Sequence, residues 1–87
     1  MKKILLMVLL SVASAAQANP IVKWYYTDWI IDNSTVCYNY TKNTVEWREC
    51  RRYASLYFRE QCGVYSRSSD LNRRKMFCTA ASSYSPL

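Results

Sequence analysis

Apolar side chains recur at the spacing of one helix face between residues 44 and 62. Asn43 and Glu46 have the spacing of a capping box at the start of this stretch. Gly63 stands where a left-handed C-cap is expected. The pattern therefore predicts a helix over about residues 44–62. At about 100° of rotation per residue, one face collects Trp47, Cys50, Ala54, Tyr57, Phe58 and Gln61.

A second, shorter helix is predicted over about residues 70–81. Ser68 or Ser69 can cap it, and Asp70 in its first turn suits the helix dipole. The polar residues before it favour a turn, so the two helices should form a hairpin. The last six residues, SSYSPL, predict a frayed tail.

The segment from residue 19 to residue 43 carries mixed signals. Apolar residues in IVKWYYTDWIID recur at i,i+4 spacing, which favours a helix, whereas its β-branched and aromatic content favours a strand. Residues 32–34 predict a turn. The alternation in TVCYNYT predicts short extended structure with Val36, Tyr38 and Tyr40 on one side. The expected fold is a mainly α helical hairpin, with an aromatic-rich N-terminal segment that can be helix or strand.

The first eighteen residues have the pattern of a bacterial signal peptide. Lys2 and Lys3 form a positive start, an apolar run follows from Ile4 to Ala13, and residues 16–18 form an A-x-A cleavage site. The apolar run is shorter than the ~18 residues of a membrane span. We therefore expect residues 1–18 to be removed. Residues 19–87 should form one domain that is periplasmic or secreted.

Four cysteines, at positions 37, 50, 62 and 78, fit a small exported domain. A domain this short buries only about 60% of its unfolded surface, and a disulfide typically adds ~2–4 kcal/mol of stability. Cys50 and Cys62 lie about 18 Å apart along one predicted helix, beyond the ~7 Å that a bridge spans. Two pairings remain: Cys37–Cys50 with Cys62–Cys78, or Cys37–Cys62 with Cys50–Cys78. The first is slightly favoured because the reach from Cys37 to Cys62 is taut, although Cys50–Cys78 has the better hairpin register.

Several kinds of chemistry have no residues to support them. The chain has no histidine, which removes the commonest general base and the usual zinc ligand. It contains no C-x-x-C pair and no Gly-rich phosphate loop. A metal site made of all four cysteines is an alternative by count alone. We expect a protein that is not an enzyme and needs no cofactor or metal.

Arginines and aromatic rings are the residues that a binding surface would use. The formal net charge is +6, and without Lys2 and Lys3 the remaining chain has 10 basic and 6 acidic side chains. Arginine forks bind carboxylate and phosphate bidentately, and rings stack beside them. A solvated face that keeps a small protein soluble is the alternative interpretation. The candidate binding residues are an arginine stripe with its neighbour (Arg48, Arg52, Arg59, Arg51), a second basic cluster (Arg73, Arg74, Lys75) and three rings (Trp24, Tyr25, Trp29).

These features favour a small exported interaction protein that docks a protein partner or an anionic envelope component. Peripheral contact with a membrane is compatible with this surface, whereas nucleic acid is not an expected partner because an exported chain seldom meets it. The outline is typical of bacterial, phage or plasmid accessory factors, by analogy only. The alternative is a membrane-active cationic toxin or antimicrobial protein, which would favour a helix with a wide Leu/Ile/Phe face. The sequence sets neither the partner nor the oligomeric state.

Overall fold

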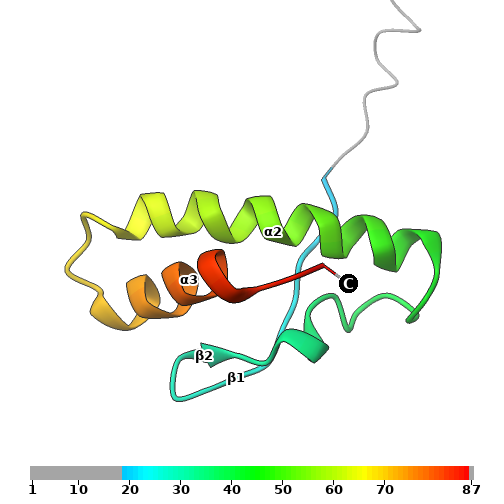
Figure 1. The fold of residues 1–87 in the computed structure, drawn as a ribbon, viewed down its shortest axis with the longest axis horizontal. Helices are drawn as coiled ribbons and strands as arrows, with labels where there is room; N and C mark the ends of the chain where they lie inside the picture. The colour runs from blue at the N-terminus through cyan, green and yellow to red at the C-terminus, as the bar shows by residue number, and fades with distance from the viewer. Residues whose placement is uncertain (1–18, 87) are drawn as a thin grey trace, which may run out of the picture.

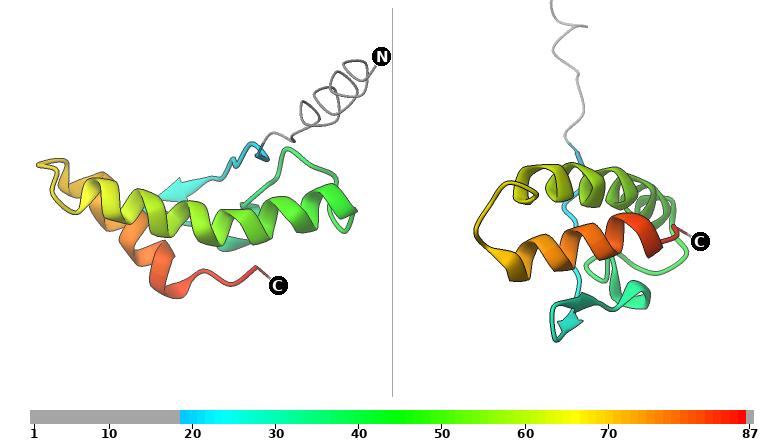
Figure 2. Two further views of the ribbon diagram at one scale, coloured as in Figure 1. Left: turned by 90° about the horizontal axis from the view of Figure 1, so that it is seen from above. Right: turned by 60° about the vertical axis from the view of Figure 1, so that its left-hand side comes forward.

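The structure, a computed structural model, describes residues 19–86. The predicted signal peptide, residues 1–18, lies outside the described residues. The elements are β1 (Tyr26–Thr27), β2 (Ile30–Ile31), a 3-10 turn η1 (Asn33–Thr35), α2 (Val45–Tyr65) and α3 (Leu71–Ser83). Figure 1 shows α2 and α3 as an antiparallel pair. Figure 2 shows the N-terminal chain crossing α2 on its way to the β1–β2 hairpin, which packs against α3 through β2. The predicted helical hairpin is confirmed.

Helix α2 has a different N-cap from the predicted one. Thr44 is the cap: its hydroxyl accepts a hydrogen bond from the Trp47 N–H at 3.2 Å and donates to the Thr41 carbonyl at 2.6 Å. Asn43 lies one residue too early and adopts a left-handed φ of 71°, a region that Asn tolerates better than most residues. The predicted capping box of Asn43 and Glu46 is therefore wrong by one position.

The predicted C-cap at Gly63 is also wrong, because α2 continues through this residue to Tyr65. Gly63 does not have a positive φ. The Ser66 hydroxyl donates to the Gly63 carbonyl at 2.8 Å, at the point where the helix ends. Local side-chain bonding at Ser66, rather than the freedom of glycine, marks the end of the helix.

We expect Gly63→Ala to raise the free energy of unfolding by about 0.5–1 kcal/mol. Alanine restricts the unfolded chain and suits a helix interior. A Cβ at Gly63 meets no atom within 4 Å, so the substitution introduces no clash. Urea denaturation of oxidised residues 19–87, followed by circular dichroism, measures the change. A fall in stability would mean that Gly63 is not helical.

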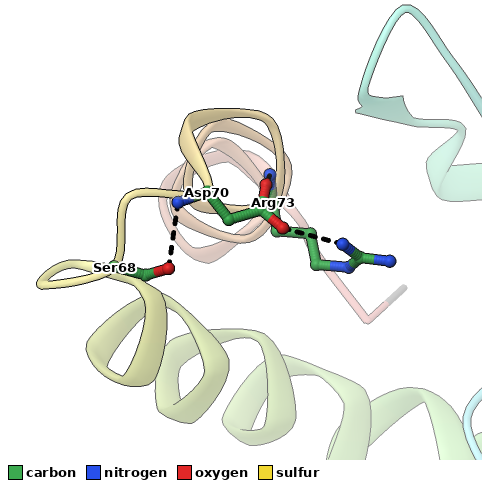
Figure 3. A network of polar contacts seen from close by, with 3 residues as sticks. All are labelled: Ser68, Asp70 and Arg73. Carbon is green, nitrogen blue, oxygen red and sulfur yellow. Dashed lines mark hydrogen bonds and ion pairs between the residues drawn. The ribbon is translucent and has the colours of Figure 1, made fainter.

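Helix α3 begins at Leu71 and is capped by Asp70, not by Ser68 or Ser69. The Asp70 carboxylate accepts from the Arg73 N–H at 3.0 Å, while the Ser68 hydroxyl accepts from the Asp70 N–H at 3.0 Å (Figure 3). Ser68 therefore supports the cap instead of forming it.

In the N-terminal segment, where the sequence allows a helix or a strand, the structure has a short β-hairpin. Tyr26 pairs with Ile31 and Thr27 with Ile30, in antiparallel register. The extended structure predicted for TVCYNYT is wrong, because these residues form turns. Cys37 has a left-handed φ of 68°, which breaks the alternation that an extended chain would show. As a result Val36 and Cys37 are both buried, whereas Tyr38 is exposed.

Both disulfides belong to the first of the two pairings. Cys37–Cys50, with a Cα–Cα distance of 6.0 Å, ties the N-terminal turns to α2. Cys62–Cys78, with a Cα–Cα distance of 4.6 Å, ties α2 to α3. Cys37 and Cys50 are fully buried and belong to the same core cluster as Phe58.

The core is built largely from aromatic rings. Phe58 meets Trp24 edge-on at a centroid distance of 5.4 Å and Tyr84 edge-on at 5.3 Å. Tyr84 is only 8% exposed, and its hydroxyl donates to the Arg51 carbonyl at 2.9 Å. The predicted frayed tail is therefore wrong for residues 82–86, because Tyr84 anchors the chain after α3 onto α2.

Arg51 lies in the interior, where it is 7% exposed. Its guanidinium carbon lies 5.1 Å from the Trp47 ring centroid and 5.3 Å from that of Tyr84. Because its acceptors come from η1 and its C-terminal flank and from the tail, one side chain joins three segments of the chain. The guanidinium donates to the carbonyl groups of Asn33, Val36, Ser85 and Pro86, at 2.8–3.3 Å.

Candidate docking groove

An open groove of about 340 Å³ lies between the chain that precedes β1, the β1–β2 hairpin and α3. Val22 and Trp24 contribute apolar surface from the N-terminal chain, and Met76 and Phe77 contribute it from α3. Met76 and Phe77 are almost fully buried, and the Trp24 ring packs edge-on against Phe77 at 5.8 Å. These walls are therefore part of the core, so the groove exists before any ligand binds.

Trp29 lines the groove from a backbone position that disfavours it. Asp28 and Trp29 form the two-residue turn between β1 and β2, with φ values of 52° and 61°. Two positive φ values are typical of a type I′ turn, in which Asn-Gly is the preferred pair. A left-handed conformation costs a bulky residue roughly 1–2 kcal/mol relative to glycine. Backbone strain of this kind is found at functional sites, which makes Trp29 a candidate binding residue.

The Trp29 ring has two partners at the mouth of the groove. It stacks on Tyr26 with a centroid distance of 5.2 Å and an interplanar angle of 25°. The Arg73 guanidinium carbon lies 6.0 Å from the Trp29 ring centroid, a distance at which a cation and a ring attract each other. The turn of the hairpin and α3 therefore meet through these two side chains.

Arg73 is held in place from the other side by the cap of its own helix. Its Nη1 contacts the Asp70 carboxylate at 2.7 Å (Figure 3). Hydrogen bonds from the Arg73 backbone N–H and then from its guanidinium lower the pKa of the Asp70 carboxyl, and the same pairing raises the pKa of Arg73. The Arg73 side chain is still 50% exposed. Within residues 19–86 its Nε and Nη2 have no hydrogen-bond acceptor, so they are free to meet an anionic ligand.

Exposed rings extend the aromatic surface of the groove, from Tyr38 in its lining to Tyr25 beside it. Tyr25 and Tyr38 stack at a centroid distance of 4.5 Å, and they are 59% and 46% exposed. Tyr26 is also exposed, whereas Trp24 packs against the helices. So small a body cannot cover all its N-terminal rings, and exposed clusters of this kind are typical of contact surfaces.

The structure does not bring the ten predicted binding residues into one surface. Arg48, Arg52 and Arg59 are exposed on α2. Arg51 is buried, which corrects its place among the predicted binding residues.

The three residues of the second basic cluster, Arg73, Arg74 and Lys75, also do not form one surface. Arg74 donates to the Ser68 carbonyl at 3.2 Å, which uses its guanidinium to hold the turn between the helices. Lys75 is exposed. Of the predicted residues, only Trp24, Trp29 and Arg73 line the groove, with Tyr25 beside it.

Sequence reasoning did not single out several residues of the groove. Lys23 supplies its second cation, and Tyr38 supplies a further ring. The period-2 spacing of Val22, Trp24 and Tyr26 is a signal in the sequence that could have placed them together. Tyr38 gives no such signal, because its approach depends on the turns around Cys37.

No protein-family model matches this chain, and no curated protein or solved structure is significantly similar to it. The residues and geometry of the groove are therefore the basis on which its function can be argued.

Proposed function

We propose that this chain is a small exported, non-enzymatic interaction protein that docks a protein partner or an anionic envelope component. The observation that carries the proposal is the convergence of Trp24, Trp29 and Arg73 in one open groove beside exposed tyrosines. Trp, Tyr and Arg are the residues that most often dominate binding energy at protein interfaces.

The charges of the groove select the chemistry of the partner. Lys23 and Arg73 are its two cations, and Asp70, the carboxylate held beside Arg73, is already used by that pairing. A carboxylate or phosphate can accept from the free N–H groups of Arg73, and hydrogen bonds to a charged group are worth about 1.5–3 kcal/mol. An anionic group next to an apolar one therefore fits the groove.

Two observations support an exported protein. Both pairs of cysteines form disulfides, which persist in oxidising compartments and are rare in the cytosol. Residues 1–18 have the composition of a signal peptide. Together they support a periplasmic or secreted location.

The membrane-active alternative has less support from α2. Its exposed face carries Glu49 and Glu60 as well as arginines, and its exposed apolar residues are only Val45, Leu56 and Val64. A membrane-active helix needs a wide apolar face opposite its cations. None of the helices in residues 19–86 is long and apolar enough to cross a membrane.

We expect Trp29→Gly to abolish partner capture while changing the free energy of unfolding by no more than about 1 kcal/mol. Glycine removes the ring but relieves the left-handed turn, so the two effects on stability oppose each other. Immobilised oxidised residues 19–87 are exposed to a bacterial envelope extract, and bound components are identified by mass spectrometry. Urea denaturation of the same variant measures its stability.

Arg73→Ala and Arg52→Ala form the matched pair for this experiment. Both remove one positive charge, but only Arg73 lies in the groove. Capture should fall with Arg73→Ala and persist with Arg52→Ala. Equal losses would show that binding follows net charge rather than the groove. Strong leakage of anionic vesicles by the unmodified protein would favour the membrane-active alternative.

A further inference from the structure

The chain that precedes β1 is extended and is paired along one edge only. Backbone groups of three alternate residues, Ile21, Lys23 and Tyr25, bond to residues 32–40 at 2.7–3.2 Å. In an extended chain, the N–H and C=O groups of neighbouring residues point to opposite edges. The edge formed by the alternate residues 21, 23 and 25 is therefore occupied by the chain that follows the hairpin.

The opposite edge belongs to Val22 and Trp24, and it is unpaired. No N–H or C=O group of these two residues makes a hydrogen bond to any part of the chain from 19 to 86. Val22, Lys23 and Trp24 all line the groove, although side chains of consecutive residues in an extended chain point to opposite faces. The groove also reaches Tyr38, on the side that residues 32–40 fill. The unpaired edge lies at the groove because Val22 and Trp24 are themselves among its lining residues.

We propose that this edge binds an extended acidic peptide segment of a partner protein, which pairs with Val22 and Trp24 and places one apolar or aromatic side chain in the groove. The proposal rests on the proposed function and names the partner's chemistry. A peptide backbone presents a donor and an acceptor on each side every second residue, about 6.6–6.8 Å apart, which is the repeat of the Val22–Trp24 edge. Addition of a strand to an unpaired edge is an established form of peptide recognition, in which pockets for alternate side chains give specificity.

The charges beside the edge favour an acidic segment. Lys23 lies between Val22 and Trp24, and Arg73 lies across the groove with free N–H groups. A carboxylate of the peptide can reach one of these cations while its backbone pairs with the edge. An acidic segment also suits a chain with 10 basic and 6 acidic side chains after residue 18.

A second copy of this chain and a lipid surface both fit the edge less well. Antiparallel pairing of two copies across Val22 and Trp24 centres on Lys23, which would then face the Lys23 of the other copy. Like charges directly opposite each other destabilise a strand pair. Acyl chains have neither donors nor acceptors, so a lipid would leave the backbone groups of the edge without partners.

The proposal is tested with peptides of known sequence. Oxidised residues 19–87 are used to select from a phage-displayed library of random octapeptides, and calorimetry measures the affinity of a selected synthetic peptide. We expect enriched peptides to carry an acidic residue and an aromatic or aliphatic residue. Methylation of the peptide backbone nitrogens, one position at a time, should weaken binding at alternate positions only. This scan uses the unaltered protein, so it does not depend on how a variant folds.

Val22→Pro and Val22→Ala form the matched pair on the protein side. Proline removes the edge N–H and keeps an apolar side chain, whereas alanine keeps the N–H and loses more of the side chain. We expect Val22→Pro to bind the selected peptide about tenfold more weakly than Val22→Ala, as the loss of a backbone hydrogen bond at the edge implies.

Three results would overturn the proposal: no enriched peptide, equal affinity of the two Val22 variants with no alternation in the methylation scan, or a dimer in sedimentation that Val22→Pro dissociates. The third would assign the edge to a second copy. If envelope capture still depends on Trp29 and Arg73 but is the same for both Val22 variants, the proposed function stands and the strand addition does not.

Discussion

Arg51→Met is expected to lower the free energy of unfolding by about 3–5 kcal/mol. Methionine fills much of the same space but cannot donate to the four carbonyl groups that Arg51 now satisfies. A buried acceptor without a donor costs about 1–3 kcal/mol, and water can recover part of this cost at the three partly buried bonds. A domain of this size has a total stability of only about 3–10 kcal/mol, so the variant should lose a large part of it and unfold at a much lower urea concentration.

Arg52→Met is the matched control because it makes the same chemical change on the next residue of α2, which is exposed. Its effect should stay within about 0.5 kcal/mol. Urea denaturation of the two oxidised variants gives the comparison directly. If Arg51→Met were within 1 kcal/mol of Arg52→Met, Arg51 would not hold the N-terminal turns and the tail together as we describe.

Removal of the Cys37–Cys50 disulfide by double replacement with alanine is the second change with a large expected effect, about 3–5 kcal/mol. Loop closure alone accounts for about 3 kcal/mol at a sequence separation of 13 residues. Both cysteines are 0% exposed, so the loss of their sulfur atoms also leaves unfilled space in the core. This variant should unfold at a lower urea concentration than any other described above except Arg51→Met.

The double replacement of Cys62 and Cys78 separates these two contributions. The Cys62–Cys78 disulfide has a sequence separation of 16 residues, so its loop-closure contribution differs from that of Cys37–Cys50 by only about 0.2 kcal/mol. Cys62 and Cys78 are partly exposed, and their removal leaves less space in the core. We therefore expect it to cost about 1–2 kcal/mol less than removal of Cys37–Cys50. Equal losses from the two double replacements would show that packing around the central disulfide adds nothing.

The helical part of the fold could be predicted from sequence because its signals are local. Apolar spacing located the first helix, capping residues located the second, and the length of the first helix excluded the Cys50–Cys62 bridge. The helix ends were less accurate because several polar residues compete for each cap. Thr44 displaced Asn43, and Asp70 displaced its serine neighbours, by one or two positions.

The interior role of Arg51 could not be predicted in the same way. A buried arginine needs acceptors, and its four carbonyl groups come from the turn region near residue 33 and from the tail near residue 86. Neither segment has a sequence pattern that predicts these contacts with Arg51. Position on a helical wheel placed Arg51 next to the aromatic face, but only the full fold shows that the tail covers it.

The groove could not be predicted from the sequence either, because contacts between distant segments of the chain form it. Sequence reasoning identified Trp24, Trp29 and Arg73 as binding residues but grouped Arg73 with its charged neighbours. The structure instead sets Arg73 beside Trp29, because β2 packs against α3. Arg48, Arg52 and Arg59 share a face of α2 as predicted and remain apart from the rings of the groove. A contribution of these three arginines to binding stays a prediction.

The central claim is that two disulfides close a small exported scaffold and thereby hold the walls of the groove together. Mapping of the cysteine pairs by mass spectrometry tests it most directly, with the full chain exported by a bacterial host and recovered without reduction. We expect a mature N-terminus at Asn19, the pairs Cys37–Cys50 and Cys62–Cys78, and no free thiol. Four free thiols, or a peptide that links Cys37 to Cys62, would contradict the account.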